Sequence, residues 1–237
     1  MKTKIIAIIK SLPAGRAIYL CLLSFYKAII TPIRCRRLQR YGFKILGELN
    51  DVLTMHKIEY YVSYGTLLGI VRERNFLRHD DDIDIWVNHD NVKNVKEFVK
   101  KMSDVGFSFK HVLLIGDQIL YYTFKRYQVS VDMFCFIRAE DGSGLYISGV
   151  YTDLNIKYEK PSQNSWRRIK RPNIDSGKEI ECGGSRFVVP ANAIEILEAL
   201  YGKGWDIPNP NWVDEDTPQQ FEYMPGFTEC ICDADAL

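Results

Sequence analysis

Residues 62–87 read VSYGTLLGIVRERNFLRHDDDIDIWV, and the fold and the function are predicted mainly from them. An apolar strand runs into Gly65-Thr66, and a short helical turn follows. Four aspartates then stand within five residues, namely Asp80, Asp81, Asp82 and Asp84. Packing does not explain why the chain tolerates the repulsion among these four carboxylates. A bound hard divalent cation would explain it, because proteins hold such cations by carboxylate oxygens. The stretch therefore predicts a metal-dependent phosphate-transfer site.

The alternation of acids with apolar residues separates the four aspartates into two groups. Alternate side chains of a strand share one face, so Asp82 and Asp84 point the same way while the intervening isoleucines point into the core. Asp80 has the same parity but precedes the apolar run, and we expect it in a loop. Asp81 faces away from the pair on a simple strand. Either Asp80 or Asp81 could accept the proton of an acceptor hydroxyl.

A third acid is expected from a neighbouring strand. Asp132 stands in VSVDMF, residues 129–134, which is otherwise a β-type run. A buried carboxylate without a partner is costly, so a partner is predicted. That partner is either a metal ion shared with Asp82 and Asp84, or Lys125 or an arginine.

Gly65 and Thr66 are predicted to hold phosphate. Glycine lets the backbone approach a ligand closely, and a helix that starts after it presents N–H groups to an anion. Thr66 adds a hydroxyl group. Arg72 follows about two turns later and either reaches a phosphate through its planar guanidinium or ends the helix in solvent.

Other kinds of site fit the sequence less well. Asp80-x-Asp82-x-Asp84 begins like a calcium-binding EF-hand loop, but Ile85 stands where such a loop needs glycine and Asn91 where it needs glutamate. No Rossmann, P-loop or deaminase motif is present. The four histidines have no ligand spacing, and His79, which precedes the aspartates, is expected to have a structural or solvent role. The basic run around Trp166 is interpreted as a solvated face, so no nucleic-acid partner is expected.

The charge of the chain is unevenly distributed. The first 47 residues carry ten Lys or Arg residues and no acid, whereas the other 190 carry 21 bases and 30 acids. No uninterrupted apolar run reaches the ~18 to 20 residues that a membrane-spanning helix needs. A signal peptide is not favoured, because Lys10 follows only five apolar residues.

We therefore predict a basic amphipathic arm over residues 1–37, formed by one or two helices that end at Arg34, Arg36 and Arg37. Such an arm suits an anionic cytoplasmic membrane surface. The alternative is a helix that simply packs on the domain. The six cysteines lack zinc-site spacing, which favours reduced thiols in a cytosolic protein.

The remaining pattern predicts an α+β domain over residues 38–237. Apolar periodicity predicts helices over 38–57, 66–71, 90–105 and 191–201, and strands over 58–63, 83–87, 107–114, 119–127, 129–137, 145–150 and 186–189. Residues 153–180 are not assigned. The tail after Asp206 contains four prolines and is predicted to be irregular.

Three parts of the sequence resemble the LicD family of phosphotransferases, and the fukutin-like proteins are similar. They are Tyr64-Gly65-Thr66-Leu67-Leu68-Gly69 with Arg72, the run Asp80-Asp81-Asp82-Ile83-Asp84-Ile85, and a closing segment with Val189-Pro190, Tyr201-Gly202, Trp205 and Pro208. The glycine, the acid pair and the distant Asp132 also resemble the nucleotidyltransferase fold. Arg78-His79 depart from the family, which usually has Pro-Trp there, and this departure bears on donor or acceptor preference.

The resemblance implies a nucleotidyltransferase-like mixed β-sheet flanked by helices, here with an N-terminal helical arm. It implies transfer of a phosphorylated alcohol, most often phosphocholine from CDP-choline, to a cell-surface glycan or a lipid-linked glycan precursor. Asp82, Asp84 and Asp132 would hold Mg²⁺ or Mn²⁺, with Asp81 as a further catalytic acid and Gly65, Thr66, Arg72 and Asp80 as substrate-binding residues. We expect a cytoplasmic protein, peripheral at the membrane face. The alternatives are a nucleotidyltransferase that leaves a nucleoside monophosphate on its product, and a non-catalytic binding protein.

Overall fold

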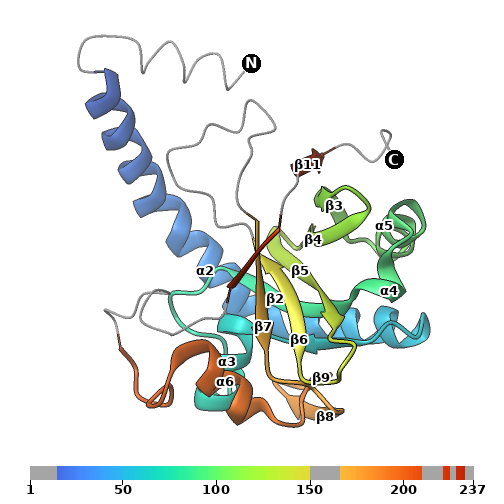
Figure 1. The fold of residues 1–237 in the computed structure, drawn as a ribbon. Coiled ribbons are helices and arrows are strands. Elements are labelled where there is room, and N and C mark those ends of the chain that lie inside the picture. Colours follow the sequence, from blue (N-terminus) through green and yellow to red (C-terminus); the bar gives the residue numbers. More distant parts are fainter. Residues whose placement is uncertain (1–14, 150–165, 210–220, 225–227, 233–237) are drawn as a thin grey trace.

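The computed structural model describes residues 15–149, 166–209, 221–224 and 228–232 of the chain. Within them, one large mixed β-sheet lies at the centre and helices pack against it (Figure 1). Its strands are β1 (Tyr60–Val62), β2 (Asp82–Asn88), β3 (Ser108–Ile115), β4 (Gln118–Arg126), β5 (Val129–Arg138), β6 (Leu145–Gly149), β7 (Trp166–Arg171), β10 (Phe221–Met224) and β11 (Thr228–Ile231). The order is β10-β7-β6-β5-β4-β3-β11, and β1 and β2 join through the pairing of β2 with β5. The predicted α+β fold with a mixed sheet is confirmed.

Strand β2 carries the aspartates through the interior of the molecule. It pairs antiparallel with β1 and parallel with β5. Ile83, Ile85 and Trp86 are fully buried, as expected for a strand covered on both faces. The parallel register puts Asp84 beside Asp132, so the pairing of β2 with β5 positions the site.

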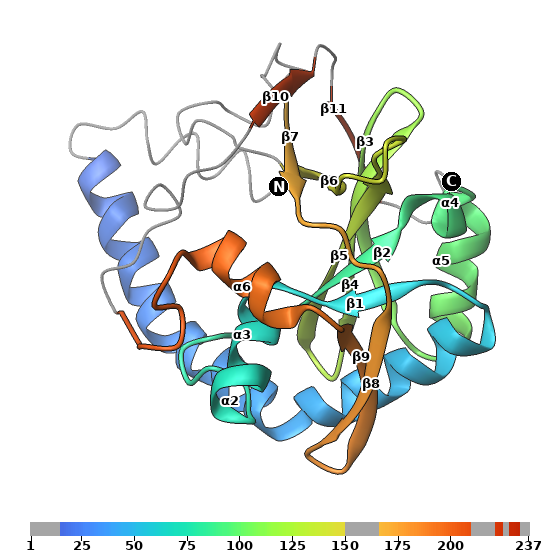
Figure 2. The ribbon, with the colours of Figure 1, turned by 60° about the horizontal axis from the view of Figure 1, so that its bottom comes forward.

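One long helix, α2 (Gly15–Met55), forms the N-terminal part of the described structure. Its first part extends away from the sheet, whereas its later part packs on β2, β5 and strand β9 (Ser185–Pro190), as Figures 1 and 2 show. The predicted helix end at Arg34, Arg36 and Arg37 is therefore wrong. No glycine or proline follows Arg37 at once, and the fully buried Leu38 continues the helix into the core.

The arm itself is only partly described. Residues 1–14, where the predicted arm begins, lie outside the described residues. Among the helices that are described, none is both long enough and apolar enough to cross a membrane. The division between an arm and a domain at residue 37 stays a prediction.

Four shorter helices complete the described set: α3 (Tyr64–Glu73), α4 (His89–Val92), α5 (Val95–Asp104) and α6 (Ala193–Tyr201). The single helix predicted over 90–105 is wrong, because α4 and α5 are separate. Asn94 starts α5, and its side chain accepts a hydrogen bond from the Glu97 backbone N–H at 3.2 Å. An asparagine cap of this kind favours a new helix start over continuation.

The later part of the chain is more regular than predicted. Strand β8 (Gly177–Cys182) and β9 form a hairpin, and its turn contains Gly183 and Gly184, both with positive φ. Such a two-residue turn suits two glycines. The prediction of an irregular tail is wrong, because β10 pairs with β7 and β11 pairs with β3. Backbone hydrogen bonds to sheet edges make these pairs, and they leave little pattern in the sequence.

Candidate metal centre

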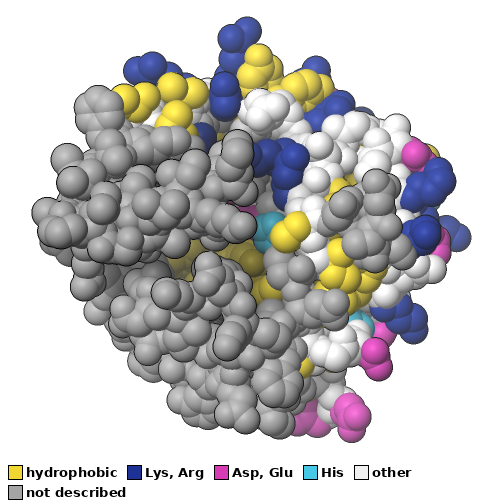
Figure 3. All heavy atoms as spheres, turned by 90° about the horizontal axis from the view of Figure 1, so that it is seen from above, with side chains coloured by type: hydrophobic (Ala, Val, Ile, Leu, Met, Phe, Trp, Pro, Cys, Tyr) yellow, Lys and Arg dark blue, Asp and Glu magenta, His cyan; other side chains and the backbone are white. Residues whose placement is uncertain are grey.

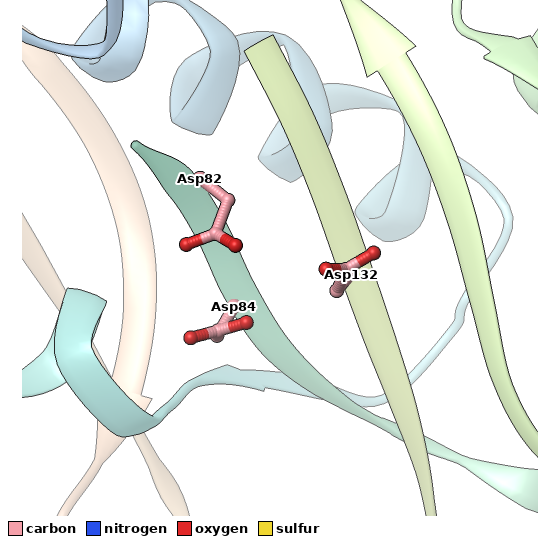
Figure 4. Close-up of side chains that lie close together, drawn as sticks. All are labelled: Asp82, Asp84 and Asp132. Atoms are coloured by element: carbon pink, nitrogen blue, oxygen red, sulfur yellow. The ribbon is translucent and has the colours of Figure 1, made fainter. Parts of the chain in front are cut away.

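Three carboxylates from two adjacent strands converge at one point. One oxygen each of Asp82, Asp84 and Asp132 lies within 4.8 Å of the others, and Figure 4 shows the three side chains turned toward a common space. Asp82 and Asp84 share a face of β2 because only one residue, Ile83, lies between them. Asp132 comes from β5 at the position that pairs with Asp84. The structure thus brings together the three acids that the sequence predicted as metal ligands.

The charge state of these acids fits a cation site. Burial, together with the charges of Asp82 and Asp132, raises the pKa of Asp84 well above its usual value. Burial and the neighbouring charge of Asp132 raise the pKa of Asp82 to about 6. Burial also raises the pKa of Asp132. A hard divalent cation relieves this repulsion and accepts carboxylate oxygens as ligands, so the donor set fits Mg²⁺ or Mn²⁺.

Asp80 lies against the start of α3. Its Oδ2 atom is buried and has no hydrogen-bond partner among the described residues. Burial and the charge of Asp82 raise the pKa of Asp80 to about 7. A Cβ atom at Gly65 would lie 2.7 Å from that oxygen, so any other residue at 65 would displace the Asp80 carboxyl. Glycine at this position is therefore what allows Asp80 and α3 to approach.

Asp81 forms an ion pair with an arginine of the long helix α2. Its Oδ2 atom lies 3.1 Å from Nε of Arg34, on α2. The side chain of Gln39, one turn further along α2, donates hydrogen bonds to the backbone carbonyls of Phe76 and Leu77, both at 3.1 Å. Helix α2 thus supports the loop that leads into β2, the strand that carries Asp82 and Asp84. This contact was not predicted from the sequence.

The hydroxyl group of Thr66 has a structural partner. Thr66 is fully buried, and its Oγ1 accepts a hydrogen bond from the Asp84 backbone N–H at 3.0 Å. The Ser63 N–H donates to the Asp84 carbonyl at 3.1 Å. These two bonds fix Asp84 against the first turn of α3. The predicted contact of Thr66 with phosphate stays a prediction.

Arg72 lies at the other end of α3. It follows Gly65 by seven positions, which is about 10 Å along a helix axis. Its guanidinium donates to the Trp205 carbonyl at 3.2 Å and forms an ion pair with Glu73 at 2.9 Å. The structure therefore does not bring Arg72 into the acidic cluster, and its predicted role in phosphate binding stays a prediction.

Thr123 and His111 are site residues that were not predicted from the sequence. The Thr123 hydroxyl donates to Oδ1 of Asp132 at 2.5 Å, and Nε2 of His111 lies 3.3 Å from the same hydroxyl. Because the hydroxyl proton goes to Asp132, His111 donates through Nε2–H. Burial lowers the pKa of His111, which favours this neutral form. Thr123 pairs with Asp132 across β4 and β5, and its place in the otherwise aromatic run YYTF was a usable signal.

The alternative partners for Asp132 are not found. Asp132 forms no ion pair with Lys125 or with any arginine among the residues that the structure describes. Arg34 acts on Asp132 only through its charge. Seen from above, an acidic and a histidine side chain are visible close to Lys and Arg side chains (Figure 3).

Comparisons with known proteins identify a family and several relatives. The family model described as "LicD/FKTN/FKRP, nucleotidyltransferase domain" matches residues 57–192. The human ribitol-5-phosphate transferase FKTN is 24% identical over 157 residues, which are 65% of this chain and 31% of that protein. The lipopolysaccharide cholinephosphotransferase LicD of Haemophilus influenzae is 34% identical over 55 residues, 23% of this chain and 21% of that protein.

An uncharacterised protein of Rickettsia typhi is 29% identical over 69 residues, which are 29% of this chain and 22% of that protein. The chain thus spans between 21% and 37% of the curated relatives it matches. Among solved structures, the lincosamide antibiotic adenylyltransferase LnuA aligns with a TM-score of 0.40 and 14% identity, over 72% of this chain and 89% of that one.

Proposed function

The chain belongs to the LicD/FKTN/FKRP family of nucleotidyltransferase domains, and from this premise we propose that it transfers a phosphorylated alcohol from a CDP-alcohol to a hydroxyl group of a glycan. The observation that carries the proposal is the convergence of Asp82, Asp84 and Asp132 inside the matched segment. Related proteins named for phosphoribitol and phosphocholine transfer support the reaction class.

The reaction is a displacement at phosphorus. The acceptor oxygen bonds to the phosphorus that carries the alcohol, the bond from that phosphorus to the CMP oxygen breaks, and the hydroxyl proton passes to a carboxylate. Asp82, Asp84 and Asp132 would hold Mg²⁺ or Mn²⁺. When bound, such a cation neutralises the charge on the phosphate oxygens. The N–H groups of the first turn of α3, around Gly65 and Thr66, would face the donor phosphates.

Asp80 is the first candidate for accepting the proton. It has a buried carboxyl oxygen without a partner and a pKa of about 7, which is near the value that suits a general base at neutral pH. Asp81 is the second candidate, but Arg34 already holds its carboxylate. Thr123 and His111 fix the orientation of Asp132. Substitution of Asp80 should therefore slow transfer more than substitution of Asp81.

Phosphocholine and phosphoribitol are the two groups to test first. The longer alignment is with the ribitol-5-phosphate transferase, and the higher identity is with the cholinephosphotransferase. We retain CDP-choline as the leading donor. The acceptor is a glycan or a lipid-linked glycan precursor.

The test measures CMP release by the full chain from CDP-choline and from CDP-ribitol, with Mg²⁺ and a glycan extract. Mass spectrometry of the glycan then identifies the added group. We expect CMP and a glycan that carries the phosphorylated alcohol, and neither with Asp84→Asn. The matched control is Asp104→Asn, which removes an exposed acid on α5 far along the chain from the cluster. A product that carries CMP would instead support nucleotidyl transfer, and equal cellular function of Asp84→Asn would support a binding protein.

We also propose that the protein acts at the cytoplasmic face of the membrane, with residues 1–37 as the contact. The support is the basic, acid-free composition of this segment and the direction of α2, which leads away from the sheet (Figure 1). Deletion of residues 1–27 should move the protein from the membrane to the soluble fraction. Unchanged fractionation at low and high salt would contradict this proposal.

A further inference from the structure

A groove lies between α2 and the two residues that precede the aspartates. Its volume is about 800 Å³, and its walls include Cys35, Arg36 and Arg40 from one face of α2 and Arg78 and His79 from the facing loop. We propose that this groove binds the phosphate of a lipid-linked acceptor, with the lipid chain lying along α2 toward its projecting end. The identity of the ligand as the acceptor rests on the proposed phosphotransfer function.

The groove is positively charged. Three arginines line the groove and no acid does. Arg36 and Arg78 form no ion pair with any described residue, and Arg40 only covers the ring of Tyr41, at 5.2 Å. Three guanidinium groups around one space repel one another, and a phosphate with several oxygens relieves this by accepting paired N–H bonds. The groove is therefore suited to an anion with more than one oxygen.

The groove lies next to the acidic cluster. Arg78 and His79 directly precede Asp80, and Arg34 on the same helix holds Asp81. Cys35, in the groove wall, is close enough to Asp80 and Asp81 that their charges, after burial, raise the pKa of its thiol. The groove thus opens beside the acidic cluster. A ligand held there would have its adjoining hydroxyl groups near the site of transfer.

An exposed apolar surface on α2 continues from the groove. Ile29 and Ile33 are 47% and 38% exposed, which is unusual for isoleucine on a packed helix. Ile29, Ile33, Arg36 and Arg40 fall at helical spacing and form one stripe along α2. The isoleucines lie on the side of the projecting end, and the arginines lie on the side of the aspartates. This order matches a molecule with an apolar chain at one end and a phosphate at the other.

A free phosphate or a nucleotide fits this surface less well, because neither would cover the isoleucines. The groove wall is also fixed before any ligand arrives. Gln39 on α2 binds the carbonyls of Phe76 and Leu77, which lead into Arg78. The arginines are thus presented by two elements that are already joined, and the binding site does not need to be assembled by the ligand.

The test measures binding of farnesyl pyrophosphate to the full chain by titration calorimetry in EDTA. Chelation removes the metal, so binding of the pyrophosphate through a metal at the acidic cluster is excluded, and the groove variants identify the binding that belongs to the groove. We expect saturable binding that weakens at least about tenfold in the double variant Arg36→Gln/Arg78→Gln, because two charged hydrogen-bonding groups are lost. Arg37→Gln is the control for the Arg36→Gln half of this variant: it removes one positive charge from an exposed position on the same helix, outside the groove, and should change binding less than about twofold.

Inorganic pyrophosphate and farnesol test the two halves of the ligand separately. Each should bind at least about tenfold more weakly than farnesyl pyrophosphate. The variant Ile29→Asn/Ile33→Asn should weaken farnesyl pyrophosphate but leave inorganic pyrophosphate unchanged. The side chains altered in the two double variants are all exposed, so folding should be retained. Circular dichroism checks this.

Absence of saturable binding, or equal loss in the Arg37→Gln control, would overturn the proposal. Pyrophosphate binding as tight as that of farnesyl pyrophosphate would overturn the lipid assignment. The assay uses neither donor nor metal, so its failure leaves phosphotransfer untouched. Conversely, intact lipid binding without any CMP release would refute the proposed function alone.

Discussion

The acidic cluster and the basic groove lie next to each other, yet they are held in different ways. The cluster is fixed by paired strands: the register of β2 with β5 sets Asp84 beside Asp132, and buried hydroxyls of Thr66 and Thr123 hold the backbone and the carboxyl in place. The groove presents exposed arginines from a helix and a loop. The buried charges are held in fixed positions, and the exposed charges are left free to follow a ligand. This difference predicts that substitutions in the two regions will act on different steps.

The largest effect is expected in the cluster. Asp84→Asn should lower CMP release about a thousandfold, the loss typical of removing one charge-stabilising group from a preorganised site. The fold should be retained, because the variant removes a half-buried carboxylate whose ionisation is disfavoured by burial and by the neighbouring acids. Melting temperature in EDTA should therefore stay equal or rise. A large fall in melting temperature would show that the residue is mainly structural.

A smaller loss is expected from the residue behind the cluster. Thr123→Val keeps the shape of the side chain but removes the hydroxyl that orients Asp132. Activity or metal affinity should fall about 10- to 100-fold, as for other groups that orient a metal ligand. Thr123→Ser, which keeps the hydroxyl, should retain most of the activity and metal affinity. If Val and Ser variants behave alike, the hydrogen bond has no such role.

Substitution of Arg34, which lies between the acidic cluster and the groove, should change the kinetics only slightly. Arg34→Gln removes the contact with Asp81, but the Arg34 side chain is 41% exposed and such pairs contribute about 0.2–1 kcal/mol. We expect a change in KM of roughly fivefold or less and no measurable change in kcat. Steady-state kinetics with varied acceptor would show this. A large fall in kcat would mean that α2 positions the acids for chemistry rather than for binding.

The smallest expected effect is on stability as a function of pH. Burial and mutual repulsion raise the pKa of Asp82 to about 6 and that of Asp80 to about 7, above the ordinary value of 3.8. Between the ordinary and the raised pKa values, these two carboxyl groups bind more protons in the folded chain than in the unfolded chain, so their contribution to stability falls as pH rises from about 4 to about 7. We expect a melting temperature a few degrees lower at pH 7.5 than at pH 5.5 in EDTA. Mg²⁺ should reduce the difference, and a rise of melting temperature with pH in EDTA would contradict the account.

Much of the site could be predicted because its parts are local in the sequence. The alternation in Asp82-Ile83-Asp84-Ile85 identified a strand and a shared face, and the polar Asp132 in an apolar run identified its partner strand. The family resemblance drawn from the same residues is confirmed by the match over residues 57–192. These signals are strong because a carboxylate within an apolar strand is unfavourable unless a ligand or a partner stabilises it.

Other contacts could not be predicted, because they join residues far apart whose local patterns are ordinary. Arg34 reaches Asp81 only because α2 continues past the arm and packs on the sheet, and nothing near Arg34 indicates this. The strands β10 and β11 form through backbone pairing with β7 and β3, which side-chain patterns do not encode. Arg72 is a further case: its place on the helix after Gly65-Thr66 suggested either phosphate or solvent, and nothing in the sequence indicated its hydrogen bond to the distant Trp205 carbonyl.

The most direct test of the central claim is a titration of Mn²⁺ into the full chain with CDP-choline present, with the free ion followed by electron paramagnetic resonance. The account predicts a saturable class of bound Mn²⁺ that is lost in Asp84→Asn and in Asp132→Asn and retained in Asp104→Asn. Equal binding by all four proteins would contradict the claim that Asp82, Asp84 and Asp132 form a metal centre.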